Sequence, residues 1–125
     1  VPAAPYKSQL YHCDGGPLEM VKLLLYCSDV TSENGPFSFL PLDISAELWN
    51  KTNYSTDRRL TDAQVEQAIG KVEPLQALGP KGTMFLLDTA KLFHFGARVS
   101  QGAAPRLAAF IQYTKANEVG GTTYE

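Results

Sequence analysis

The sequence predicts a mainly β fold, a small sandwich or barrel of several short strands with one helical insertion. Three observations indicate this class. Short apolar segments recur along the 125 residues, and turns rich in Gly, Pro and Asn separate them. The main stretch of helical character, residues 43–70, lies between two groups of these segments. A chain of this length is expected to form a single domain, residues 1–125, with its own core.

The first group of segments precedes the insertion. Residues 1–6 are rich in proline and are expected to form an extended arm. Residues 7–13 are expected to form a strand. The strongest strand signal is residues 19–28, a nearly continuous apolar run between Gly-Gly-Pro and a polar Asn-Gly turn, as expected of a strand covered on both faces. A short strand over residues 37–40 stops at Pro41.

The insertion reads as two short helices. Residues 43–51 form the first, with Asp43 or Ser45 as its cap. Thr61 and Gln64 have the spacing of a capping box at the start of the second. Its apolar face ends at Gly70, a common helix terminator.

The second group of strands follows the insertion and supplies the other half of the sheet structure. Pro74 interrupts the first of these strands, which is therefore expected at a sheet edge. The last residues, 115–125, are polar and are expected to form a flexible tail. The expected strands are residues 72–77, 83–88, 92–99 and 106–114.

Composition excludes two classes of partner and indicates a cellular location. The net charge is −2, so nothing attracts nucleic acid or an anionic membrane surface. No apolar run approaches the roughly 20 residues that a membrane-spanning helix needs. We interpret Cys13 and Cys27 as free thiols. Free thiols are typical of a reducing compartment, which predicts a cytoplasmic location. Cys13 is interpreted as a small packing residue.

The segment around His12 carries the first chemical signal. In an extended chain His12 and Asp14 point to the same side, because strand side chains alternate, and two glycines follow them. A second histidine on a neighbouring strand would complete the 2-His-1-carboxylate face of non-haem Fe(II) oxygenases. The only other histidine is His94. Taken alone, the pattern fits equally a surface histidine beside a capping aspartate.

Several motifs in the same order resemble those of the phytanoyl-CoA dioxygenase family. They are Leu10 to Asp14, the run from Lys22 to Phe37, Gly82-Thr83, His94-Phe95-Gly96 and Pro105-Arg106. The resemblance extends over residues 8–114. It implies a double-stranded β-helix, a jelly-roll or cupin-like barrel, in an Fe(II)- and 2-oxoglutarate-dependent oxygenase.

The resemblance also implies roles for individual residues. His12, Asp14 and His94 would be the iron ligands, and Arg106 would pair with the distal carboxylate of 2-oxoglutarate. A guanidinium suits that task because it is planar, always charged and able to bind a carboxylate through two hydrogen bonds. Arg98 is the rival cation and is expected to face solvent.

Three further residues are candidates for contact with cosubstrate or substrate. Ser100 would add a hydrogen bond to 2-oxoglutarate, or it is polar loop sequence. Lys22 and Tyr26 share one face of their strand with Leu24 and would reach the pocket if that face lines the barrel. The alternative for Lys22 is a lysine that extends from a partly exposed sheet to solvent.

The predicted function is hydroxylation of a small organic substrate with O₂ and 2-oxoglutarate. The alternative is a non-catalytic or incomplete metal- or ligand-binding barrel of the same fold. An aspartate at position 14 favours hydroxylation over halogenation, since related halogenases lack that carboxylate. Family members carry a longer segment before the His-x-Asp motif, which implies either a fragment or a homodimer that covers the exposed sheet edge. The family's Pro-Gly-Ser-His turn is replaced by residues 41–45.

Overall fold

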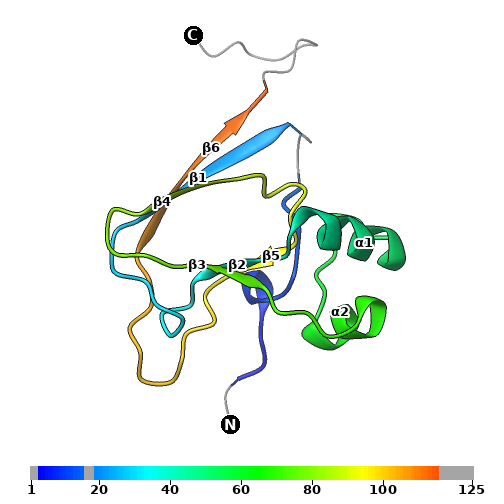
Figure 1. The fold of residues 1–125 in the computed structure, drawn as a ribbon, viewed down its shortest axis with the longest axis horizontal. Helices are drawn as coiled ribbons and strands as arrows, with labels where there is room; N and C mark the ends of the chain where they lie inside the picture. The colour runs from blue at the N-terminus through cyan, green and yellow to red at the C-terminus, as the bar shows by residue number, and fades with distance from the viewer. Residues whose placement is uncertain (1–2, 16–18, 116–125) are drawn as a thin grey trace.

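The computed structural model describes residues 3–15 and 19–115, and its first sheet is built around a long central strand. In this antiparallel sheet β1 (Met20–Tyr26) lies between β4 (Met84–Leu87) and β6 (Ala108–Thr114). All seven residues of β1 pair with β6, and four of them also pair with β4. Figure 1 shows β1 and β6 running side by side at the top of the molecule. The central strand is therefore held along both edges over part of its length.

The second antiparallel sheet has shorter strands and lies below the first in Figure 1. Its central strand β2 (Phe37–Phe39) lies between β3 (Leu75–Ala77) and β5 (His94–Phe95). The mainly β class is thus confirmed, and β3 has the predicted edge position. Within the described residues the two sheets do not close into a barrel, so the jelly-roll assignment stays a prediction.

Apolar side chains from both sheets fill the space between them. Leu24 of β1 and Leu87 of β4 belong to one buried cluster with Phe37 of β2 and Ala77 of β3. Tyr26 joins this cluster, and its hydroxyl donates a hydrogen bond of 2.5 Å to the carbonyl of Ala77. The alternation along β1 therefore directs its even-numbered residues toward the second sheet.

The predicted helical insertion is confirmed. It consists of α1 (Leu42–Thr52) and α2 (Asp62–Ile69), which pack against each other beside the second sheet (Figure 1). The capping box of α2 is present, since Thr61 Oγ1 accepts from the Gln64 amide and the Gln64 side chain accepts from the Thr61 amide. The helix ends at Gly70, whose φ of +82° favours glycine.

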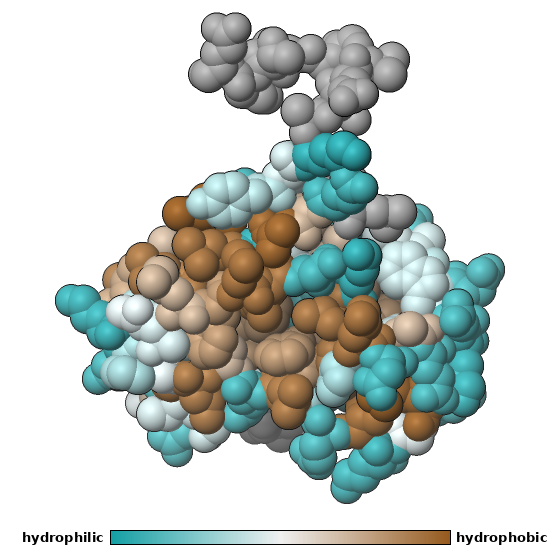
Figure 2. All heavy atoms as spheres, turned by 45° about the horizontal axis from the view of Figure 1, so that its top comes forward, coloured by the Kyte–Doolittle hydropathy of each residue, from teal (hydrophilic) through white to brown (hydrophobic). Residues whose placement is uncertain are grey.

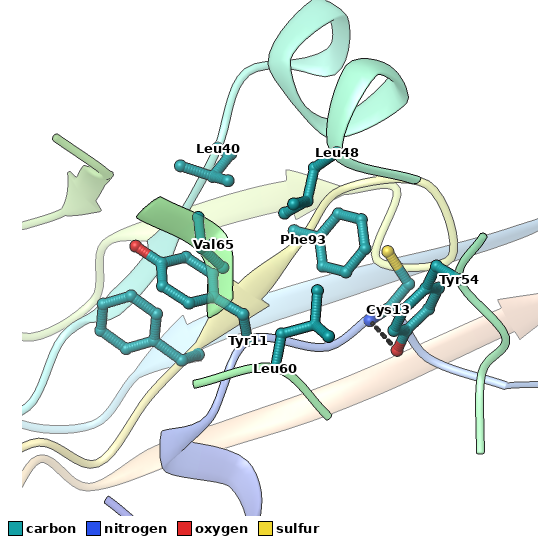
Figure 3. Packing of buried hydrophobic residues seen from close by; sticks show 9 residues of the cluster. Tyr11, Cys13, Leu40, Leu48, Tyr54, Leu60, Val65 and Phe93 are labelled. Atoms are coloured by element: carbon teal, nitrogen blue, oxygen red, sulfur yellow. Dashed lines mark hydrogen bonds between the residues drawn. The ribbon is translucent and has the colours of Figure 1, made fainter. Parts of the chain in front are cut away.

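A second buried cluster joins the helices to the segment that contains His12. Figure 3 shows Tyr11 and Cys13 among side chains from α1, α2 and the connecting loops. The amide of Cys13 donates to the hydroxyl of Tyr54 at 3.0 Å. Both cysteines are free, and Cys13 is buried, as expected of a packing residue. Packing against the helices thus fixes the chain on either side of His12.

The expected strand over residues 7–13 is wrong in its first part. A short 3₁₀ helix, η1 (Lys7–Gln9), occupies it, because the Gln9 side chain accepts from the Tyr6 amide and curls the chain. Only isolated bridges follow, from Tyr11 to Leu60 and from His12 to His94. Residues 3–6 have no regular structure and are exposed, whereas residues 1–2 of the expected arm lie outside the described residues.

All four strands after the insertion are shorter than predicted, and the differences are largest at β5. The expected strand over residues 92–99 is limited to β5. Before it, the amides of Lys91 and Leu92 donate to the Asp88 carbonyl in a turn, and after it Ala97 has a φ of +59°. The last strand begins at Ala108, and the expected tail from residue 116 onward lies outside the described residues.

The outer face of the β4-β1-β6 sheet is apolar, and none of the described residues covers it, which corrects the expectation that residues 19–28 are buried on both faces. Outward side chains from all three strands are 36–69% exposed. Figure 2 brings this side of the molecule forward and shows apolar side chains gathered over it. They are Val21, Met84, Leu86, Ile111 and Tyr113. Neither helix of the described residues has the length and apolar character needed to cross a bilayer.

Candidate metal centre

Backbone pairing brings the two histidines side by side. The amide of His12 donates to the carbonyl of His94 at 3.0 Å, and the amide of His94 returns the same bond to His12 at 3.0 Å. Directly opposed residues in an antiparallel pair place their side chains close together on one face. The two imidazole rings accordingly lie with centroids 4.3 Å apart.

Hydrogen bonds to the backbone orient both imidazoles in the same way. His12 Nδ1 lies 2.9 Å from the carbonyl oxygen of Leu10, and His94 Nδ1 lies 2.8 Å from that of Leu92. A carbonyl oxygen only accepts, so each Nδ1 carries a proton, and in the neutral tautomer of each ring Nε2 would keep the free lone pair. This is the arrangement in which histidines bind metal ions.

Asp14 supplies an oxygen at the point where the two imidazoles meet. Its Oδ1 lies 3.7 Å from His12 Nε2 and 3.6 Å from His94 Nε2. The donor atoms of the three residues all lie within 4.8 Å of one another. An ion about 2 Å from each donor fits such a group. His12, Asp14 and His94 could therefore hold a metal ion.

The protonation states suit a divalent cation. Burial alone would raise the pKa of Asp14, but the neighbouring His94 and Lys22 side chains outweigh it and hold that pKa below its usual range. Burial, together with the proximity of His94, lowers the pKa of His12. The group therefore presents an ionised carboxylate and a neutral imidazole at neutral pH. Borderline and hard cations such as Fe(II) accept this donor set.

The three donors line a cavity of about 240 Å³. Lys22 and Arg106 bring two cations to the same cavity, and Thr89 contributes a buried hydroxyl. Phe37 and Phe110 form apolar parts of the wall. The Phe37 ring stacks on His94 with centroids 5.0 Å apart, which restricts the imidazole further.

Arg106 lies in this cavity, and none of the described carboxylates pairs with it. Within residues 3–15 and 19–115 its buried Nη1 has no hydrogen-bond partner, and no carboxylate forms a salt bridge with it. Burial lowers the pKa of Arg106. Gly96 makes the room, because a Cβ at position 96 would lie 2.6 Å from Arg106 Nη2. Leaving a partly buried cation unpaired costs free energy, so an anionic group could be accommodated beside Nη1.

The other residues predicted from the sequence lie in three different places. Lys22 lines the cavity, where its Nζ contacts Asp14. The Tyr26 hydroxyl donates to the Ala77 carbonyl in the core between the sheets, and Tyr26 does not line the cavity. Ser100 is exposed on a loop and lines a different surface pocket. The structure therefore brings Lys22 into the cavity with the metal donors but leaves Tyr26 and Ser100 outside it.

Arg98, the rival cation, also lies elsewhere. Its guanidinium binds both carboxylate oxygens of Asp62, at 2.8 and 2.7 Å, and covers the Phe95 ring. Sequence reasoning missed Thr89 and Phe110. Phe110 could have been found, because it shares strand parity with Arg106 along the last strand. No sequence pattern distinguishes Thr89 from other threonines at a turn.

Comparisons with known proteins found no match to any family model and no matching curated protein. The resemblance to phytanoyl-CoA dioxygenases therefore stays a prediction.

Proposed function

We propose that this protein is an Fe(II)- and 2-oxoglutarate-dependent dioxygenase of the double-stranded β-helix type that hydroxylates a small organic substrate. One observation carries the proposal. The partly buried guanidinium of Arg106, whose Nη1 has no hydrogen-bond partner among the described residues, lines the same cavity as the convergent donors of His12, Asp14 and His94. A metal ion together with a separate cationic side chain suits a 2-oxo diacid. One end of such an acid chelates the metal, and the carboxylate at its other end can pair with the guanidinium.

The chain's own residues would bind and orient the reactants. Three protein donors leave other metal positions free for the 2-oxo acid and O₂. Arg106 would hold the distal carboxylate and so fix which way the diacid lies. Phe37, which is buried, would limit the access of water to the reacting atoms on its side of the cavity, which strengthens the electrostatic contacts there.

The bound Fe(II) would supply the oxygen chemistry. In the overall reaction, O₂ and 2-oxoglutarate give CO₂ and succinate, which takes one oxygen atom. The other oxygen atom enters a substrate C–H bond and gives an alcohol. The protein's contribution is binding, orientation and exclusion of water.

The test is the formation of succinate from 2-oxoglutarate under air with added Fe(II), in wild type, Asp14→Asn and Asp43→Asn. Asp43 is exposed in the first turn of α1 and serves as the matched carboxylate control. We expect succinate from wild type and from Asp43→Asn, and a loss of at least about 100-fold in Asp14→Asn, because the metal loses its anionic donor. Equal, metal-independent rates in all three proteins would refute the proposal.

Metal binding measured in parallel separates the alternative function. If wild type binds Fe(II) but forms no succinate with any substrate offered, the chain is a non-catalytic metal-binding module. If neither wild type nor Asp43→Asn binds a divalent ion, both functions are excluded.

A further inference from the structure

The two oxygens of the Asp14 carboxylate have different neighbours. Oδ1 faces both imidazole Nε2 atoms, at 3.7 and 3.6 Å. Oδ2 accepts a hydrogen bond from Lys22 Nζ at 2.5 Å. Both side chains are largely shielded from water, with 22% of Lys22 and 19% of Asp14 exposed. One oxygen is thus directed toward the metal position and the other is engaged by a cation.

Lys22 is well placed to keep this arrangement fixed. It lies in the middle of the first sheet, paired with Leu87 of β4 on one side and Gln112 of β6 on the other. Asp14 is fixed separately, because its amide donates to the Thr89 carbonyl at 2.9 Å. The contact therefore joins two anchored backbones, and both side chains are largely shielded from the solvent that weakens exposed ion pairs.

A carboxylate without such a partner can bind a metal through both oxygens. A second oxygen on the metal would occupy a position that a chelating cosubstrate requires. We infer that Lys22 is a positioning residue that holds Asp14 as a one-oxygen ligand and so keeps a metal position free for the 2-oxo acid. The claim that Lys22 keeps Asp14 a one-oxygen ligand needs only the His12–Asp14–His94 group. The claim that this leaves a position for the 2-oxo acid rests on the proposed function.

Charge gives a second consequence of the same contact. The Lys22 ammonium offsets the single negative charge of the donor set, so it weakens the attraction between the protein and a dication. Its removal should therefore not reduce metal affinity. A residue that merely stabilised the fold would behave differently, since its loss would lower stability and metal affinity together.

The experiment compares wild type with Lys22→Met, Lys22→Arg and Lys115→Met. Lys115 is an exposed lysine that pairs with Glu19 at the end of β6, and it serves as the matched control. Three quantities are measured: Co(II) affinity, the visible absorption spectrum of the Co(II) protein without cosubstrate, and the affinity of the Fe(II) protein for 2-oxoglutarate from its charge-transfer absorption.

For Lys22→Met we expect Co(II) affinity equal to or above that of wild type and a changed Co(II) spectrum, because a second carboxylate oxygen joins the metal. We expect 2-oxoglutarate affinity to fall on the order of 10-fold. Lys22→Arg should restore the wild-type spectrum, since a guanidinium can also donate to Oδ2. Lys115→Met should match wild type in all three measurements.

Three outcomes would overturn the inference. An unchanged Co(II) spectrum with weaker 2-oxoglutarate binding would mean that Lys22 contacts the cosubstrate directly. Parallel losses of thermal stability and Co(II) affinity in Lys22→Met would mean a structural role. No binding of Co(II) by wild type would remove both the inference and the proposed function.

Failure of the proposed function alone gives a separate result. Wild type would then bind Co(II) but show no charge-transfer absorption with 2-oxoglutarate. The Co(II) spectra of the Lys22 variants would still decide whether Lys22 controls the coordination of Asp14.

Discussion

Gly96→Ala provides a sensitive test of the cavity, because Gly96 lies directly against the Arg106 guanidinium. A Cβ at position 96 would lie 2.6 Å from Arg106 Nη2. The backbone of Gly96 is not in the left-handed region, so alanine can adopt its conformation without strain. The atom that must move is the end of a flexible side chain. The substitution should therefore displace the guanidinium and leave the fold intact.

The expected magnitude follows from the bond that is lost. A hydrogen bond to a charged group contributes roughly 1.5–3 kcal/mol. Losing one such bond to the distal carboxylate should weaken 2-oxoglutarate binding by roughly 10- to 100-fold. The free energy of unfolding should change by less than about 1 kcal/mol, because only the end of an arginine side chain shifts.

The assay is a titration of the Fe(II) protein with 2-oxoglutarate, combined with chemical denaturation. Arg106→Met and the double variant Gly96→Ala/Arg106→Met complete a double-mutant cycle. Once Arg106 is gone, Gly96→Ala should have no further effect on affinity. The reasoning is refuted if Gly96→Ala leaves the affinity unchanged, or if it weakens binding equally with and without Arg106.

Three further predictions concern the thiols, the core and self-association. Burial raises the pKa of Cys13 to about 12, so an alkylating reagent at pH 8 should modify the partly exposed Cys27 and spare Cys13. Because Cys13 holds its proton more tightly in the folded protein, stability should fall as the pH rises from about 9 toward 12, and a flat profile would contradict this. Leu48→Ala should lower the free energy of unfolding by about 2–5 kcal/mol, since Leu48 is fully buried. Leu42→Ala, at a side chain that is 59% exposed, should change it by less than about 1 kcal/mol. Equal effects of the two substitutions in chemical denaturation would count against the assigned core. If a homodimer forms through the apolar outer face of the first sheet, Leu86→Glu should convert dimer to monomer in sedimentation equilibrium, while Leu42→Glu should not. A wild-type protein that is monomeric at all concentrations would exclude this dimer.

Local pattern was sufficient for much of the fold. The continuous apolar run predicted β1, and the Thr61–Gln64 spacing predicted the start of α2. Strand alternation also predicted that His12 and Asp14 share a side while Cys13 turns away into the core. Each of these features depends on neighbours a few residues apart, which a sequence displays directly.

Patterns failed where a distant or competing contact decided the conformation. The bond from the Tyr6 amide to the Gln9 side chain curls a segment that looked extended. The outer face of β1 looked like part of a core, but the described residues place no layer over it. Hydrophobicity alone does not say whether a second element is present to cover an apolar face.

By itself the sequence determined which residues have the chemistry of a metal site and of an acid-binding cation. Only the tertiary structure decided that His94 pairs with His12 through the backbone, that Lys22 engages one oxygen of Asp14, and that Gly96 leaves room for Arg106. These contacts join residues on different segments, and their distances depend on strand register and on side-chain packing between elements. A change of one residue in register would direct each of these side chains to the opposite face, so the donor atoms converge only after the whole fold has formed.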